Sequence, residues 1–151
     1  MKYTIHMDVQ YDFLELIDVP RLIECCTEKW YNQTLCRVND SIVRLGVFNE
    51  GEFHWHKHDD EDEFFFVLKG ELFIEIEVGA DLCVCPKPVG VDLRVCPKSV
   101  AEVSDFHFET ISLKQHQGIT IPKGVLHRPY VKEPTAVIMV EKDTVIPIGD
   151  G

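Results

Sequence analysis

The chain has 151 residues, about the length of one domain. Its 15 lysines and arginines are outnumbered by 26 aspartates and glutamates, which gives a formal net charge of −11 at pH 7. A surface this acidic repels phosphate backbones and anionic lipids, so nucleic acids and membrane surfaces are disfavoured as partners. Residues 1–10 lack the apolar stretch of a signal peptide, and no apolar run approaches the length of a membrane span. We therefore expect a soluble, cytoplasmic protein.

The first predicted element is a short helix before residue 34. Asp18 could cap its N-terminus, and Pro20 lies in its first turn. Its apolar stripe is formed by Leu22, Ile23, Cys26 and Trp30. From residue 34 onward, turn residues and short alternating apolar runs predict strands instead.

The strands are predicted at residues 34–38, 41–48, 52–58, 63–68, 71–78, 111–113, 118–122, 127–131 and 136–141. The dipeptides Asn39-Asp40 and Lys69-Gly70 are predicted to close two hairpins. Strands this short and this closely spaced predict an all-β sandwich or barrel. We expect a single domain over residues 1–151, with its core at about 34–141.

A near-repeat interrupts the predicted strands, because residues 81–89 recur as residues 92–100. Two copies are too few for a repeat array, which needs about three to bury a shared core. The prolines Pro86, Pro88 and Pro97 lack the amide donor of a central strand, so the duplicated excursion at 80–100 is expected at an edge or in a long loop. The alternative interpretation is a lid over a site, since long loops are often functional.

The cysteines could in principle pair as disulfides, but a chain without an export signal lies among reducing thiols. None forms a C-x-x-C pair, so the usual thiolate zinc or redox motif is absent. We expect free thiols that are buried as small hydrophobes. They are Cys25, Cys26, Cys36, Cys83, Cys85 and Cys96.

The residues that carry chemistry begin with an alternating His-x-His-x-His run. Side chains at i and i+2 of a strand point the same way, so His54, His56 and His58 are predicted to share one face. The intervening residues, among them Phe53, are predicted to share the other face. Glu63 opens the next strand after a turn and can swing its carboxylate back toward the imidazoles.

A further histidine follows much later in the chain. Residues 119–129 offer a strand, a Pro/Gly turn and then His127, which is placed to return to the first cluster across a hairpin. Imidazole nitrogens together with a carboxylate oxygen suit divalent Mn, Fe, Co, Ni or Zn. The pattern therefore predicts a site for one divalent ion.

These residues resemble the two motifs of the cupin superfamily. The first motif, His-x-His, three or four residues, Glu, six residues and Gly, is matched by His56, His58, Glu63 and Gly70. The second motif, Pro-x-Gly-x-x-His, is matched by Pro122, Gly124 and His127. The resemblance implies a cupin barrel (the double-stranded β-helix or jelly roll), with a divalent metal held by the three histidines and the glutamate. It also implies frequent homodimerisation.

More narrowly, residues 54–63 and 122–129 resemble small single-domain cupins of the mannose-6-phosphate-isomerase-like type. The similarity covers roughly residues 30–73 and 118–150 and leaves the 80–100 excursion outside it. Two glycine positions depart from the motifs. Only four residues separate Gly51 from His56, where the first motif has five, and His116 stands where the second has a glycine. These glycines serve turns, so the ligand assignment is unaffected.

Four protein ligands on a six-coordinate ion leave two adjacent positions open. Our first hypothesis is a metal-dependent enzyme that moves a proton, as an isomerase does, on a small sugar, sugar acid or keto acid. His54 is its candidate general acid or base, and a solvent-facing bystander is the alternative. An Fe(II) dioxygenase, with residues 64–66 as an apolar wall, is the second hypothesis. A non-catalytic metabolite-binding sensor is the third.

Several charged residues near the motifs leave alternatives open. An anionic substrate would need one of Arg44, Lys123 and Arg128, although ordinary surface charge explains all three. Asp62 could replace Glu63 as a ligand if the spacer were three residues.

The expected partners are a small-molecule ligand and a second copy of the chain. A homodimer follows from the resemblance and from the need to cover sheet edges and outward aromatic residues. Those aromatic residues are Trp55, Phe64 and Phe66.

Overall fold

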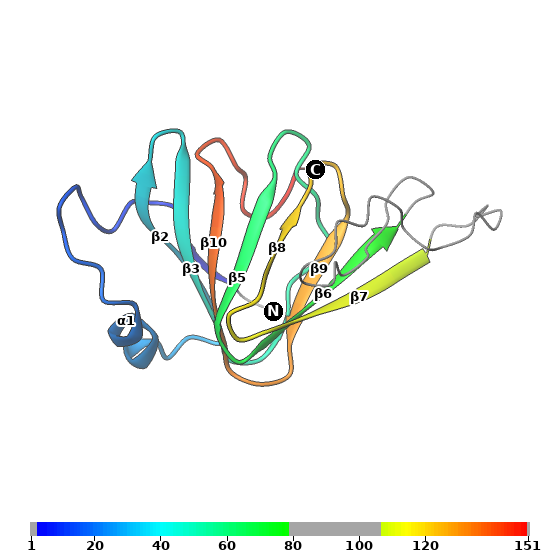
Figure 1. Ribbon diagram of the computed structural model, residues 1–151, viewed down its shortest axis with the longest axis horizontal. Coiled ribbons are helices and arrows are strands. Elements are labelled where there is room, and N and C mark those ends of the chain that lie inside the picture. The colour runs from blue at the N-terminus through cyan, green and yellow to red at the C-terminus, as the bar shows by residue number, and fades with distance from the viewer. Residues whose placement is uncertain (1–2, 79–106, 151) are drawn as a thin grey trace, which may run out of the picture.

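The computed structural model describes residues 3–78 and 107–150, and its strands form two sheets that face each other like the arms of a V (Figure 1). Sheet A has the strand order β1 (Thr4–His6), β2 (Trp30–Val38), β3 (Ser41–Phe48), β10 (Thr135–Lys142), β5 (Glu63–Lys69) and β8 (Gly118–Ile121). Sheet B has the order β4 (Gly51–Glu52), β9 (His127–Val131), β6 (Glu71–Val78) and β7 (His107–Lys114). This arrangement confirms the predicted all-β, jelly-roll class, although the described strands form two facing sheets and not one closed barrel.

The core lies between the two sheets. Strand β6 alternates strictly, so that Leu72, Ile74 and Ile76 are buried while its acidic residues and Phe73 face outward. Across from it, Phe65 and Val67 of β5 point into the same cluster. Each strand therefore presents one apolar face to the interior.

The turn at Lys69-Gly70 does not close a hairpin, which corrects the prediction. Strand β5 pairs with β10 and β8 in sheet A, whereas β6 pairs with β9 and β7 in sheet B. The chain thus crosses from one sheet to the other at Gly70, which has φ +82°. Crossing lets the apolar faces of both strands meet across the core, and the turn residues alone cannot distinguish this from a hairpin. The predicted hairpin from β2 to β3 through Asn39 is confirmed. The hairpin predicted to lead to His127 is wrong, since β8 lies in sheet A and β9 in sheet B.

Gly70 provides the first testable prediction. A Cβ at this position would lie 2.6 Å from both the Pro134 carbonyl oxygen and the Thr135 Oγ1. Gly70→Ala should therefore destabilise the fold by more than the about 1–2 kcal/mol that a left-handed backbone costs. Gly124→Ala is the matched control, because Gly124 has φ +79° and a Cβ there would meet no atom of the described residues within 4 Å. Equal decreases in the free energy of unfolding of the two variants, measured by urea denaturation, would contradict the steric argument.

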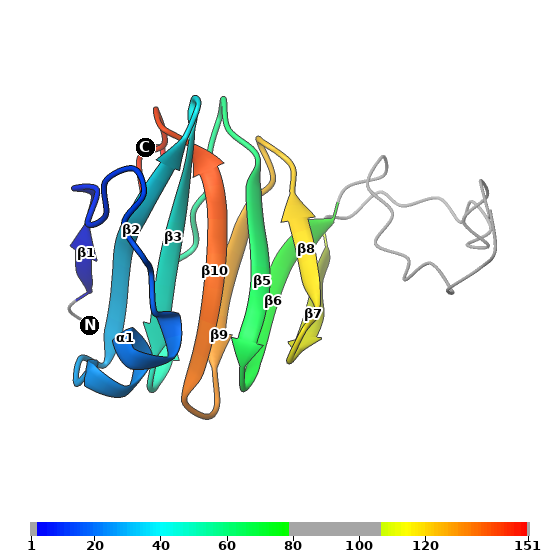
Figure 2. The ribbon, with the colours of Figure 1, turned by 60° about the vertical axis from the view of Figure 1, so that its left-hand side comes forward.

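The predicted helix forms as α1 (Val19–Cys25), with Asp18 accepting a hydrogen bond from the Arg21 amide at 3.3 Å. It ends earlier than its apolar stripe suggested, because Trp30 begins β2 and is buried in the core. The helix lies on the outer face of sheet A (Figure 2) and packs against a second cluster centred on Leu35, Leu45 and Val47. Strand β1, which pairs in parallel with β2, was not predicted.

Some predictions fall on residues outside the described ranges, namely the 80–100 excursion and the cysteines Cys83, Cys85 and Cys96. Within residues 3–78 and 107–150 the cysteines are free, but Cys25 is exposed and Cys26 and Cys36 are only partly buried. The expectation of buried thiols is therefore wrong for these three. No helix in the described part of the chain is long and apolar enough to cross a membrane.

Candidate metal centre

The two sequence motifs meet at a backbone bridge. The predicted strand at 52–58 is wrong in most of its length, because β4 ends at Glu52. His56 nevertheless pairs with His127 at the start of β9: the His56 amide donates to the His127 carbonyl at 3.0 Å, and the reverse bond is 2.9 Å. This bridge fixes the position of the two histidines relative to each other. It also breaks the predicted alternation, since the Phe53 ring packs on the inner side within 5.0 Å of the His56 ring.

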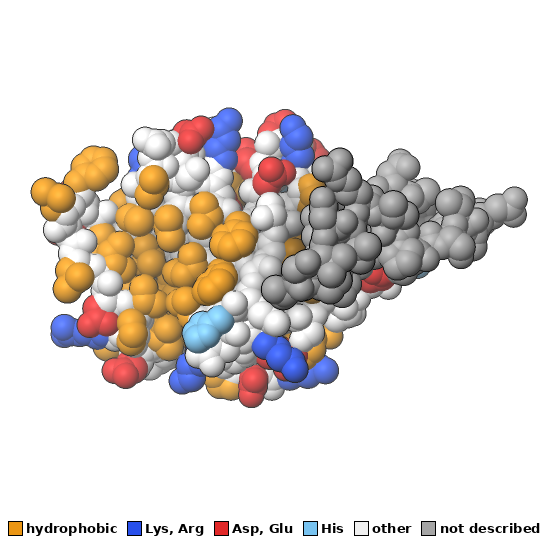
Figure 3. All heavy atoms as spheres, viewed as in Figure 1, with side chains coloured by type: hydrophobic (Ala, Val, Ile, Leu, Met, Phe, Trp, Pro, Cys, Tyr) orange, Lys and Arg blue, Asp and Glu red, His pale blue; other side chains and the backbone are white. Residues whose placement is uncertain are grey.

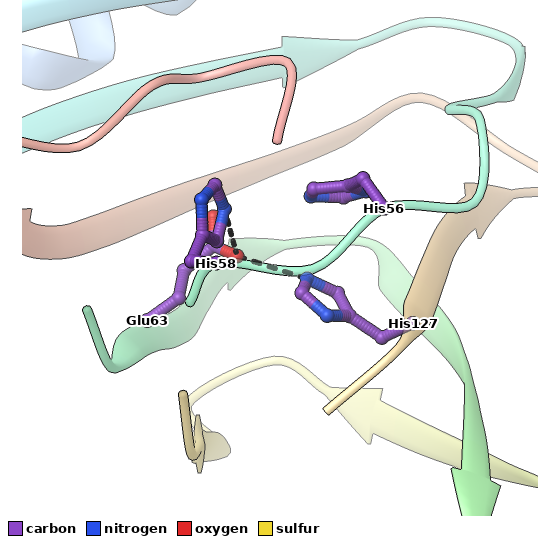
Figure 4. Close-up of side chains that lie close together, drawn as sticks. All are labelled: His56, His58, Glu63 and His127. Carbon is purple, nitrogen blue, oxygen red and sulfur yellow. Dashed lines mark hydrogen bonds and ion pairs between the residues drawn. The ribbon is translucent and has the colours of Figure 1, made fainter. Parts of the chain in front are cut away.

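Four buried side chains turn toward one point between the sheets, as Figure 4 shows. They come from the segment before β5, from the first residue of β5 and from the first residue of β9. One ligand atom from each lies within 4.8 Å of the others, and every residue of the set is at most 7% exposed. The structure thus brings together the predicted set His56, His58, Glu63 and His127.

Backbone carbonyls orient two of the imidazoles. Nδ1 of His56 donates to the His54 carbonyl at 3.0 Å, and Nδ1 of His127 donates to the Val125 carbonyl at 2.9 Å. A proton held at Nδ1 leaves the Nε2 lone pair free for a metal. Histidines that bind a metal through one ring nitrogen usually donate from the other to a carbonyl or carboxylate in this way.

His58 shows that the site suits a cation. Both of its ring nitrogens are buried and lack a hydrogen-bond partner among the described residues. A buried polar atom without a partner costs free energy, and a metal bound at one nitrogen would remove that cost for it. Glu63 supplies the negative charge, with Oε2 at 3.5 Å from His58 Nε2 and 3.0 Å from His127 Nε2. Adjacent ligands at about 2.1 Å from one ion lie about 3.0 Å apart when they subtend a right angle, so the donor set fits one divalent ion.

No family model matches the sequence. The protein YdbB of Bacillus subtilis (strain 168), described as uncharacterized, is 36% identical over 101 residues. The aligned region covers 67% of this chain and 63% of that protein, so the chain spans less than two thirds of that relative's length.

Solved structures resemble the chain more completely. A cupin-2 domain protein from Shewanella frigidimarina NCIMB 400 is 26% identical, with a TM-score of 0.59, over 84% of this chain and 94% of that chain. The fold is that of the cupin superfamily. A cupin superfamily protein from Desulfitobacterium hafniense DCB-2 matches at a TM-score of 0.55 and 13% identity, over 87% of this chain and 93% of that one, which shows the fold alone.

Burial and charge set the protonation of the cupin histidines. Burial, followed by the nearby His127, lowers the pKa of His56 to about 4, so His56 is neutral near pH 7. Burial also acts to lower the pKa of His58, but its contacts with Glu63 outweigh this and raise it. Burial opposes ionisation of Glu63, yet its contacts with His127 and His58 hold the pKa of that carboxyl well below its ordinary value.

These directions predict how metal uptake depends on pH. A raised pKa means that His58 carries a proton that an incoming ion must displace, whereas His56 carries none above about pH 4. Lowering the pH from about 8 to about 6 should therefore weaken metal binding by at least about 4-fold. Calorimetric titration in buffers of different ionisation enthalpy measures the protons released. Binding that is independent of both pH and buffer would contradict this assignment.

A buried polar network that sequence reasoning missed supports Glu63. Arg44 is fully buried, donating from Nε to Thr34 Oγ1 at 3.2 Å and from Nη1 to Glu141 Oε2 at 3.4 Å. Glu141 in turn lies close enough to Glu63 for the two carboxyls to influence each other's ionisation. Burial and then the charge of Glu63 raise the pKa of Glu141 well above its ordinary value. The interpretation of Arg44 as ordinary surface charge is therefore wrong.

A small cavity connects this network to the metal ligands. Its volume is about 20 Å³, enough for one water, which needs about 10–15 Å³. Its polar lining is formed by Asn32, Arg44, His56, Glu63 and Glu141. Phe65 is the only member of the aromatic run 64–66 among its lining residues, because Phe64 and Phe66 point to the outer face of sheet A.

The other candidate charges lie away from the cavity. Arg128 pairs with Glu75 at 2.5 Å on the outer side of sheet B, and Lys123 is exposed. Asp62 is also exposed and accepts the Lys123 amide at 2.9 Å, so it does not take the place of Glu63.

His54 lies beside the cluster and not in it. Its ring is exposed, 5.5 Å from the His56 ring, and its Nε2 donates to the Ile148 carbonyl at 2.7 Å. A catalytic role for His54 therefore stays a prediction.

A second group of carboxylates, also missed in the sequence, lies behind His58. Glu61 and Asp150 each place an oxygen within 4.8 Å of a His58 nitrogen and of each other. Glu61 accepts from Thr144 Oγ1 at 2.7 Å, and Asp150 accepts from the Asp59 amide at 2.7 Å. These carboxylates thus join the C-terminal segment to the ligand loop and are near enough to influence the orientation of the His58 ring.

Proposed function

We propose that this cupin is a metal-dependent enzyme that transfers a proton on a small polar molecule such as a sugar, sugar acid or keto acid. The observation that carries the proposal is His58, whose buried nitrogens have no hydrogen-bond partner among the described residues, in a cluster of three imidazoles and one carboxylate. Such a centre, once loaded, polarises a carbonyl group or lowers the pKa of bound water. The residues suit Mn, Fe, Co, Ni or Zn in the divalent state.

The chain's own residues would perform distinct tasks in this scheme. Nε2 of His56 and His127 and a nitrogen of His58 would hold the ion, and Glu63 would balance part of its charge. The Arg44–Glu141 pair, which borders the same cavity as Glu63, would help to position the Glu63 carboxylate. His54 is the proposed proton carrier, and it would have to exchange its bond to the Ile148 carbonyl for one to the substrate.

The test begins with elemental analysis of the purified protein before any metal is added. The apoprotein is then loaded with each candidate ion and incubated in D₂O with aldoses, ketoses, sugar acids and keto acids. Exchange of a carbon-bound proton, followed by NMR and lost in His58→Leu, is the expected result. Ligand binding without any exchange would favour the metabolite sensor, and oxygen consumption with Fe(II) alone would favour the dioxygenase.

We also propose that two copies associate through the outer face of sheet A. Figure 3 shows apolar side chains gathered over this sheet, and they include the half-buried Val43, Phe64, Phe66, Ile138 and Val140. A patch of this kind is a common site of protein association. Trp55 does not join it, because its ring lies by Phe108 of sheet B, at 4.8 Å, and by Arg128.

Light scattering tests this dimer. Wild type should have the mass of two chains, and Phe66→Lys should have the mass of one, because it places a charge in the apolar patch. Phe108→Lys is the matched control, since Phe108 is 59% exposed on the other sheet. A monomeric wild type would refute the proposal.

A further inference from the structure

Arg44 has an unused donor inside the cavity that borders the metal ligands. Its side chain is fully buried, and Nε and Nη1 are occupied by Thr34 and Glu141. Nη2 is buried without any partner in the described part of the chain. Leaving a guanidinium donor unpaired in the interior is costly, so an acceptor is expected here, either the one water that the cavity can hold or a ligand oxygen that displaces it.

Asn32 provides a second unpaired group in the same cavity. Its Oδ1 is buried without a partner among residues 3–78 and 107–150, while Nδ2 makes only a 4.0 Å contact with the Met139 sulfur. The cavity therefore presents one donor and one acceptor that these residues do not satisfy. A ligand with an anionic oxygen and a neighbouring hydroxyl would satisfy both.

The charge of the metal-loaded centre also favours a ligand that carries a negative charge. A divalent ion and Arg44 together bring three positive charges, against at most two negative charges from Glu63 and Glu141. Within the cavity at least one positive charge is left over even when both carboxyls are ionised, since Glu61 and Asp150, which lie near His58, do not line it. Charge buried in this way is stabilised by an opposite charge within the site.

We infer that Arg44 is the specificity-determining residue for a carboxylate, and that the ligand of this cupin is a small hydroxy or keto acid bound between the metal and Arg44 Nη2. The inference rests on the proposed function, because it assumes a loaded centre. A cavity of about 20 Å³ admits a carboxylate oxygen more readily than a tetrahedral phosphate with three oxygens. The free face of a guanidinium is a good partner for a carboxylate in a dry site.

Binding to the metal-loaded protein tests the inference with matched probes. D-glucuronate and D-glucose share a ring and differ in the carboxylate, and D-glucose 6-phosphate carries a phosphate at the same carbon. Protein loaded with Co²⁺ is titrated with each, and binding is read from the visible spectrum and from the melting temperature. Glucuronate should bind at least about 10-fold tighter than glucose, and tighter than the phosphate, because a charge-assisted hydrogen bond is added.

Arg44→Lys and Arg44→Met should each reduce the preference for glucuronate over glucose, measured as the ratio of the two dissociation constants on the same variant, to less than about threefold. The comparison of the three probes on wild type stands even where a variant fails to fold. Equal binding of glucuronate and glucose, tighter binding of the phosphate, or a carboxylate preference that survives in both variants would each overturn the inference. Failure of wild type to take up Co²⁺ would overturn the proposed function on which it rests, and metal content is therefore measured first.

Discussion

Replacing His58 by leucine is expected to abolish metal binding without weakening the metal-free fold. The imidazole is 2% exposed, and its two nitrogens have no hydrogen-bond partner in the described part of the chain, so in the absence of metal the side chain contributes desolvated polar atoms. An apolar side chain of similar size removes that cost, and such replacements are close to neutral or stabilising. At pH 8, where the pairing of a charged His58 with Glu63 matters least, the free energy of unfolding should be equal to or above that of metal-free wild type.

With metal present the order of stability should reverse, so that wild type has the higher free energy of unfolding. The free energy of unfolding of wild type should rise by about 4 kcal/mol when the ion is present at about 1,000 times its dissociation constant, because the ion binds only the folded state. The free energy of unfolding of His58→Leu should not change when the ion is added, and elemental analysis should find no stoichiometric metal in this variant. His107→Leu is the matched control, since His107 is exposed on β7, outside the cluster. Stoichiometric metal in His58→Leu would show that this residue is not a ligand.

The ligand set was predictable because each motif fixes its own local geometry. His56 and His58 are two residues apart, Glu63 opens the next strand, and a Pro-x-Gly turn precedes His127. The positions of these groups therefore depend mainly on contacts that are local in the sequence. The long-range step is the pairing of His56 with His127. The sequence predicted that His127 returns to the first cluster, but it did not predict this pairing. The strand predicted at 52–58 was wrong in most of its length, but the ligand prediction did not depend on it, because one backbone bridge holds both histidines.

The charges behind the ligands were not predictable in the same way. Arg44 lies on the same face of β3 as Ile42 and Phe48, so the alternation of the strand already placed it inside. The usual exposure of arginine argued against that interpretation. What permits its burial is Glu141, 97 residues later in the chain, and only the pairing of β10 with β3 brings the two strands together. The β5 to β6 crossing was missed for a similar reason, since a turn sequence does not specify which sheet follows it.

The Arg44–Glu141 pair gives the second large prediction, which concerns stability. Its side chains are 1% and 2% exposed, so removing one partner leaves an uncompensated charge in the interior. Arg44→Met should lower the free energy of unfolding of the metal-free protein by about 3–5 kcal/mol, because the buried Glu141 and Glu63 carboxyls then lose their guanidinium partner. Arg37→Met is the matched control. Arg37 pairs with Asp143 at the surface, where its side chain is 48% exposed, and the expected loss is about 0–1 kcal/mol.

The double variant Arg44→Met/Glu141→Leu distinguishes a lost charge pair from lost packing. Buried ion pairs replaced on both sides by apolar groups often cost little, so the double variant should be more stable than Arg44→Met alone. Urea denaturation of wild type, both single variants and the double variant closes the cycle. A double variant as unstable as the sum of the two single variants would mean that Arg44 stabilises the fold through its contacts alone.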